Sequence, residues 1–245
     1  LRAGQHGVAT FLPLNKLRAP EPDAKLKAPY QFAFPDIEGA EHPPVFAIPG
    51  NHDWYDGLVN FLALFARAKP SRVGNYRTQQ RRSYFAARLT ESCWLWAVDI
   101  ALVADMDQPQ ADYFVAIAEA MPQNASIILC SAEPGWYRVE SNAYRTLSYA
   151  AWIAENAGKA LRIPLVLSGD SHHYSRYEGE SGTQYVTAGG GGAFLHGTHQ
   201  LPETIEAEWL RRPHEKLTLQ SAFPTAETSR RLLWGNLLFP FSNAS

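Results

Sequence analysis

The sequence predicts one α/β domain, because strand-like apolar runs and segments with helical periodicity alternate along the chain. Three of the apolar runs end in polar or glycine-rich loops. The length of 245 residues and the hydrophobic content of 46% suffice for one large core, and this composition excludes global disorder. Ligands of open α/β sheets bind at loops that follow the carboxyl ends of strands, so these three loops are the candidate site.

The chain opens with a segment of little periodicity. Residues 1–44 are rich in Pro, Lys and Ala, so we expect an irregular arm with one strand near 31–34. Residues 45–48 form a short apolar run that a Pro-Gly pair stops, which is typical of a buried strand leading into a loop. Apolar side chains then recur at helical spacing and predict a helix from Leu58 to near Pro70.

The middle of the chain continues the alternation. Two runs of strand character, 83–89 and 94–103, precede a segment at 110–121 whose spacing predicts a helix. A short apolar strand is expected at 127–130, and a longer helix is expected at 141–156.

The last predicted strands lead into the most polar loops. The strand at 163–167 ends in Gly-Asp-Ser-His-His at 169–173, and the strand at 184–187 ends in the glycine run 189–192. A final helix is expected near 225–233. The predicted organisation is an irregular arm (1–44), a core (45–200) and a C-terminal extension of the same domain (201–245).

Charge and cysteine content exclude several classes of protein. The formal net charge is only -2, so no whole-molecule field attracts nucleic acid or an anionic membrane. The two cysteines lie in apolar runs, which excludes a disulfide framework. We see neither a secretory signal nor a run long enough to cross a bilayer. We therefore expect a cytoplasmic protein, with membrane attachment only through a segment beyond residue 245; the oligomeric state is not predicted.

Two loops carry residue types that suit metal chemistry. The loop Gly50-Asn51-His52-Asp53 follows the strand at 45–48, and the loop 169–173 follows the strand at 163–167. Amide oxygen, carboxylate and neutral imidazole are ligands of divalent Mn, Fe or Zn. An imidazole beside a carboxylate, as in His52-Asp53, is also suited to proton donation. A plain turn and a solvated surface loop are the alternative interpretations of these two segments.

At these residues, over roughly 29–200, the chain resembles a bacterial branch of the calcineurin-like metallophosphoesterases. The family's third motif, Gly-Asn-His-Asp, is complete at 50–53. Its last motif, Gly-His-x-His, is matched at 169–172 with Asp170 in place of the first His. The wider context LSGDSHHY and VTAGGGGAFLHGTH is similar as well. The resemblance implies a sandwich of mixed β-sheets flanked by helices.

The resemblance also implies roles for individual residues. Asn51, Asp170 and His172 would bind metal, His52 would assist the departing oxygen, and Asp53 would orient His52. Two divalent ions (Mn, Fe, Mg or Zn) would support hydroxide attack on the phosphorus of a phosphoester. At the second metal, the oxygen ligands of Asn51, Asp170 and a further candidate, Glu133, would favour Mn or Mg over Zn.

One further ligand is expected in the loop after the strand at 127–130. The family's fourth motif falls at 127–134, where Ala132 occupies the expected His position. Glu133 is the substitute oxygen ligand, and an ordinary loop carboxylate is the alternative interpretation.

A basic stretch suggests where a phosphorylated small molecule or other phosphoester would bind. Residues 67–88 contain seven Arg or Lys residues and no acidic residue. Arg81 and Arg82 are assigned to substrate binding because guanidinium groups suit phosphate oxygens, with solvated surface as the alternative. His173 is assigned to the same role, with a structural role as the alternative. The Trp residues do not alternate regularly with basic residues, as they would in a surface that stacks bases, so no nucleic-acid partner is evident.

The family's opening motifs, Asp-x-His and Gly-Asp, do not occur before Gly50. We therefore expect that the first strand and the first metal loop are missing and that this fragment is inactive alone. The second hypothesis is a non-catalytic relative that binds or regulates. Upstream coding sequence would separate the two hypotheses.

Overall fold

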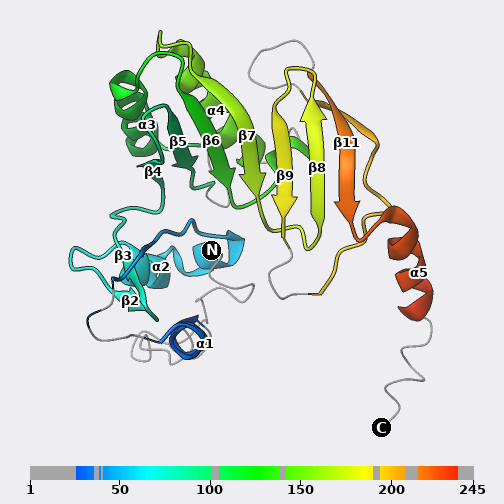
Figure 1. Ribbon diagram of the computed structural model, residues 1–245, viewed down its shortest axis with the longest axis horizontal. Coiled ribbons are helices and arrows are strands. Elements are labelled where there is room, and N and C mark those ends of the chain that lie inside the picture. Colours follow the sequence, from blue (N-terminus) through cyan, green and yellow to red (C-terminus); the bar gives the residue numbers. More distant parts are fainter. Residues whose placement is uncertain are drawn as a thin grey trace.

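The described chain is mixed α/β, with two mixed sheets flanked by helices (Figure 1). The computed structural model describes residues 26–35, 39, 41–100, 105–137, 142–189, 194–207 and 215–236. Within these ranges no helix is both long enough and apolar enough to span a membrane.

The larger sheet has eight strands in the order β10-β11-β8-β9-β7-β6-β5-β4. Their bounds are β4 Phe85–Arg88, β5 Cys93–Ala97, β6 Ser126–Ser131, β7 Arg162–Ser168, β8 Tyr174–Gly179, β9 Gln184–Ala188, β10 Thr204–Ala207 and β11 Glu215–Phe223. The central strands β5, β6, β7 and β9 are parallel, and the outer pairs are antiparallel. The loops after the four parallel strands therefore lie along one edge of the sheet.

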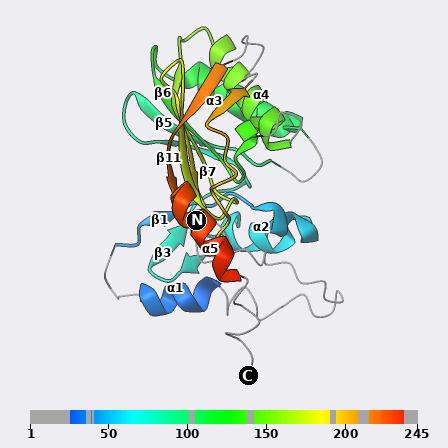
Figure 2. The ribbon, with the colours of Figure 1, turned by 90° about the vertical axis from the view of Figure 1, so that its right-hand side faces the viewer.

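Two helices cover one face of this sheet (Figure 2). They are α3 (Gln108–Ala120) and α4 (Asn142–Asn156). Asp107 caps the start of α3: its side chain accepts a hydrogen bond from the Gln110 N–H and so satisfies one of the first-turn donors. A last helix, α5 (Ala226–Asn236), follows β11.

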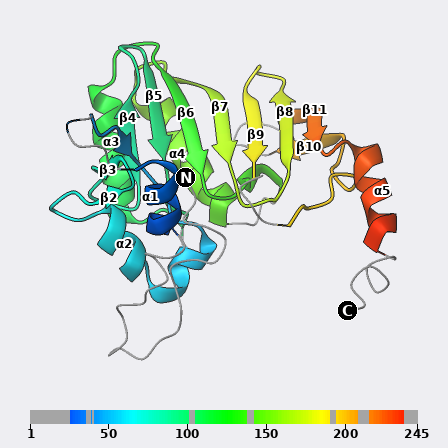
Figure 3. The same cartoon turned by 60° about the horizontal axis from the view of Figure 1, so that its bottom comes forward.

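The smaller sheet lies near the carboxyl ends of β5 and β6 (Figures 1 and 3). Its strands are β1 (Pro44–Val45), β2 (Arg72–Val73) and β3 (Tyr76–Thr78), in the order β1-β3-β2. The nearby helices are α1 (Ala28–Ala33), the 3-10 helix η3 (Asn51–Asp56) and α2 (Val59–Phe65). The small core beneath this sheet is formed by Ala47, Leu58, Phe61, Leu64, Phe65 and Val73.

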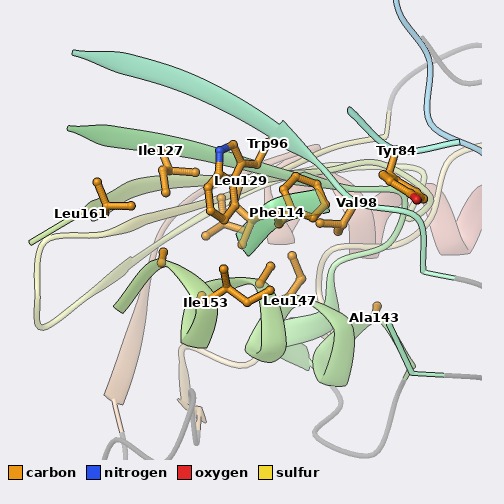
Figure 4. Close-up of a cluster of buried hydrophobic side chains, with 14 of the residues drawn as sticks. Tyr84, Trp96, Val98, Phe114, Ile127, Leu129, Ala143, Leu147, Ile153 and Leu161 are labelled. Atoms are coloured by element: carbon orange, nitrogen blue, oxygen red, sulfur yellow. The ribbon is translucent and has the colours of Figure 1, made fainter. Parts of the chain in front are cut away.

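The main core fills the space between the large sheet and the two helices (Figure 4). Trp96 and Leu129 of the strands meet Phe114 of α3 and Leu147 of α4, and all four side chains are fully buried. Alternate residues of β6 are buried and half-buried, as expected for a strand with one face against helices.

Most strands and helices expected between residues 83 and 188, and the final helix, are confirmed with shifts at their ends. The expected strand 94–103 is shorter, because β5 ends at Ala97. Its last positions, and residue 141 of the expected helix, lie outside the described residues. The same holds for most of the arm, residues 1–25, and for glycines 190–192.

The strand expected near 31–34 is wrong, because this segment forms α1. Proline is tolerated in the first turn of a helix, where Pro29 lies. The rings of Tyr30 and Phe34 then both contact the ring of Tyr76, with centroids 6.2 and 5.4 Å away. These contacts anchor α1 to the small sheet without a strand partner.

The strand expected at 45–48 is confirmed only at its start, because β1 ends at Val45. Beyond it, the buried side chain of Gln80 takes the place of a neighbouring strand. The Ala47 N–H donates to Gln80 Oε1 (2.7 Å), and Gln80 Nε2 donates to the Ala47 carbonyl (2.8 Å). A side-chain amide thus satisfies both backbone groups of the segment that leads into Gly50.

Three strands of the large sheet, β8, β10 and β11, are absent from the sequence-based expectation. In β11, Glu215 and Leu217 are buried while Lys216 and Thr218 are exposed, which is the period-two pattern of a strand. The pattern is easily missed, because one of its buried members is a glutamate.

Candidate functional site

Both polar loops approach the edge formed by the carboxyl ends of the parallel strands. The Gly169 N–H donates to the Ala132 carbonyl (3.1 Å), which joins the loop after β7 to the loop after β6. The Gly189 N–H donates to the His173 carbonyl (3.0 Å), which joins the same loop to the end of β9. The residues around 132, 169–173 and 189 therefore lie side by side.

The loop 169–173 has a constrained backbone. Asp170 has a φ of 61°, a left-handed conformation that residues other than glycine rarely adopt. A Cβ at position 189 would lie 1.6 Å from the Ser171 carbonyl oxygen, so only glycine fits there. The close approach of Gly189 to Ser171 thus fixes the backbone of this loop against the end of β9.

Three histidines gather at this loop. His172 and His173 are both buried. The His172 N–H donates to Nδ1 of His196 (3.1 Å), and the two rings stack with centroids 4.2 Å apart. Neutral His196 therefore carries its proton on Nε2. Phe194 lies edge-on to the His172 ring, with centroids 4.6 Å apart.

Burial lowers the pKa of His173, and the nearby His196 and His172 lower it further. Burial also lowers the pKa of His196, with a second contribution from His172. Both imidazoles are thus neutral at pH 7, the form that ligates metals. Within the described part of the chain, neither ring nitrogen of His173 has a hydrogen-bond partner. His196 is not among the site residues predicted from the sequence; its position just beyond the glycine run was the available signal.

A cavity of about 620 Å³ adjoins these histidines. His173 and His196 form one side of it, together with Tyr137. Gln200 and Leu201 form part of the remainder, so the lining mixes apolar surface with uncharged hydrogen-bonding groups. Such a lining suits an uncharged organic group.

The Gly50-Asn51-His52-Asp53 motif forms the start of η3. Asp53 is buried, and its Oδ2 accepts the Gly50 N–H (2.9 Å), which closes the turn. Asn51 Oδ1 accepts the N–H of His52 (3.0 Å). The half-buried His52 ring lies against Tyr55, with centroids 4.9 Å apart.

One hydrogen bond holds this turn at the edge of the large sheet. Trp54 Nε1 donates to Oδ1 of Asp99 (2.9 Å), and Asp99 lies two residues after the carboxyl end of β5. Asp99 is buried, and its own N–H and carbonyl are bound by the side chain of Gln110. The two motif loops, far apart in sequence, therefore lie at the same edge, because β5, β6 and β7 are parallel.

The oxygen donors of Asn51 and Asp170 match the chemistry of Mn or Mg sites, and the imidazole of His172 suits Fe or Zn. Within the described ranges, however, no three His, Cys, Asp or Glu side chains are grouped closely enough to hold a metal. Ala132, at the position where the family has a His, is buried, and the Glu133 carbonyl accepts from Ser131 Oγ (2.7 Å). The donors fit the expected ions in kind, but they do not form a complete set.

The two arginines assigned to substrate binding both make structural contacts. Arg81 Nη1 donates to the carbonyls of Arg67 (2.8 Å) and Ala68, just beyond α2. The Arg82 guanidinium lies 5.2 Å from the ring centroid of Tyr113. Their role in substrate binding stays a prediction.

Neither a protein-family model nor a curated protein matches the chain.

Proposed function

We propose that this chain is part of a metal-dependent phosphoester hydrolase of the calcineurin-like kind and contributes one portion of a dinuclear site. The observation that carries the proposal is the Trp54–Asp99 hydrogen bond, which tethers η3 at the edge that also carries the loop 169–173. Bound divalent ions, Mn or Mg for the oxygen donors, would supply Lewis acidity for phosphoester hydrolysis.

The chain's own residues then have distinct tasks. Asn51, Asp170 and His172 offer an amide oxygen, a carboxylate and an imidazole as ligands. His52 holds a proton for the departing oxygen, and the bond from Gly50 to Asp53 keeps the turn that presents it. The cavity beside His173 accepts the organic part of the substrate.

We also propose that the large sheet is one layer of a sandwich. In β6 the buried Ile127 and Leu129 face the helices (Figure 4), so Ile128 and Cys130 face the opposite side and are half-buried there. An apolar second face is what a further layer would cover.

A non-catalytic binding or regulatory domain is the second candidate. Two observations favour it: Ala132 replaces the expected His, and no group of three acidic, His or Cys ligands forms in the described ranges. A domain of this kind would bind a phosphorylated ligand without hydrolysing it.

The test uses protein produced with its natural flanking sequence. Bound Mn is measured by mass spectrometry, and hydrolysis is measured with p-nitrophenyl phosphate and its bis-diester. We expect Asn51→Ala and His172→Ala to lower the Mn content, and His52→Ala to lower kcat while Mn is retained. The control is His42→Ala; His42 lies just before β1, and its ring bonds the side chain of Asn75.

Hydrolysis that is unaffected by both Asn51→Ala and His52→Ala would refute the assignment. Retention of Mn with no hydrolysis of either ester would favour the binding domain.

A further inference from the structure

A pocket of about 550 Å³ lies at the opposite edge of the large sheet from the candidate site. This volume is within the range of small-ligand pockets, roughly 300 to 1,000 Å³. Residues of the C-terminal half of α4, the amino end of β7 and the turn that joins β8 to β9 line the pocket. None of the proposed metal or substrate residues lines it.

A buried carboxylate forms part of the pocket wall. Glu215, the first residue of β11, is 9% exposed. Its Oε1 accepts hydrogen bonds from the Ser181 N–H (3.2 Å) and Ser181 Oγ (2.5 Å), and its Oε2 accepts one from the Tyr185 hydroxyl (2.8 Å). A carboxylate has about four acceptor positions, so one remains on Oε2.

All three donors to Glu215 are neutral. Among the residues that the structure describes, no Lys or Arg side chain forms an ion pair with Glu215. A carboxylate withdrawn from water without a counter-ion is costly, and a cation that reaches it lowers this cost. The wall therefore favours a positively charged ligand group.

The backbone is shaped around this carboxylate. A Cβ at Gly179 would lie 2.2 Å from Glu215 Oε1, so the end of β8 must be glycine for Glu215 to lie there. Gly182, with a φ of 83°, allows the tight turn that carries Ser181. Residues of β8, β9, β11 and the turn thus combine to hold one carboxylate at the wall.

The rest of the pocket has an apolar floor and a charged rim. Ala154, Leu161 and Val166 line it and are buried. Arg162 and Glu155 line it as exposed residues. Together, Glu155, Arg162 and Glu215 carry a formal net charge of -1 at pH 7.

We propose that this pocket binds a small organic amine, with the ammonium group on Glu215 and the apolar body against Ala154, Leu161 and Val166. The site goes beyond the proposed hydrolase function and does not depend on it.

The test is calorimetric titration of the chain at pH 7 with 2-phenylethylamine and with its neutral isostere, 2-phenylethanol. We expect the amine to bind about tenfold more tightly or better, the gain typical of a charge-assisted hydrogen bond. Glu215→Gln removes the charge and should abolish the amine's advantage while alcohol binding is unchanged. Arg162→Gln removes the competing positive charge at the rim and should strengthen amine binding.

The matched control is Glu180→Gln. Glu180 is an exposed carboxylate beside Ser181 that does not line the pocket, so this change should leave the affinities for the amine and for the alcohol unchanged. Equal binding of amine and alcohol by the unmodified chain would overturn the proposal. So would an amine affinity that Glu215→Gln leaves intact. If circular dichroism shows that Glu215→Gln does not fold, Arg162→Gln decides, because no increase in amine affinity would overturn the proposal.

Discussion

Replacement of Gln80 by leucine should destabilise the segment that presents the Gly-Asn-His-Asp motif. Gln80 is 4% exposed, and its side chain makes three hydrogen bonds, two to Ala47 and one from Nε2 to the Arg82 carbonyl (2.8 Å). Leucine has a similar volume, so packing is kept while three backbone groups lose their partner. Each unsatisfied buried group costs about 1–3 kcal/mol, and two of these belong to Ala47, which is 2% exposed.

We therefore expect Gln80→Leu to lower the free energy of unfolding by about 3 kcal/mol in urea denaturation. For a chain of this length the midpoint of thermal unfolding should fall by roughly 6–12 °C. The control is Gln79→Leu, because Gln79 is the adjacent residue and is exposed. If the two variants unfold within about 0.5 kcal/mol of each other, the role assigned to the Gln80 amide is wrong.

Three further changes test the site and its supports. Trp54→Phe keeps an aromatic ring but removes the hydrogen-bond donor to Asp99. It should lower the free energy of unfolding in urea by about 1 kcal/mol and should also lower Mn retention. Unchanged Mn retention would refute the role assigned to the Trp54–Asp99 hydrogen bond. Gly189→Ala forces a Cβ onto the Ser171 carbonyl and should cost about 2 kcal/mol, whereas a crystal structure with an unmoved loop would contradict this. Burial raises the pKa of the Cys130 thiol from its ordinary value of 9.0 to about 12. As pH rises above 9.0, the thiol therefore loses its proton in the unfolded chain before it does so in the folded chain. The free energy of unfolding should then fall as pH rises from 9.0 towards 12, and it should fall less in Cys130→Ala. The urea midpoint of each protein is measured at pH 8 and at pH 10.5. An equal change of midpoint in the two proteins would refute the pKa shift.

Strands and helices with a clear hydrophobic pattern were predictable from the sequence alone. The runs at β6, β7 and β9 are apolar and are stopped by turn residues, and α3 and α4 show helical spacing. Segments whose buried positions are polar were not predictable in this way. In β8 the buried Ser175 alternates with half-buried Tyr174 and Arg176, so a count of apolar residues does not mark the strand.

The segment at 31–34 shows a different limit. Its composition suits a strand, but a strand needs a neighbour, and the rings of Tyr30 and Phe34 find Tyr76 instead. Whether a partner strand is present depends on the fold around the segment and not on the segment itself.

The identity of the candidate ligands is a local property of two short loops, so the order of residues was enough to name Asn51, His52, Asp170 and His172. Their arrangement depends on contacts that no short window of residues contains. The Trp54–Asp99 and His172–His196 hydrogen bonds join residues 45 and 24 positions apart. The bond from Ser181 to Glu215 spans 34 positions. These contacts exist because strands distant in the chain become neighbours in one sheet, and neighbouring strands bring their loops to a common edge.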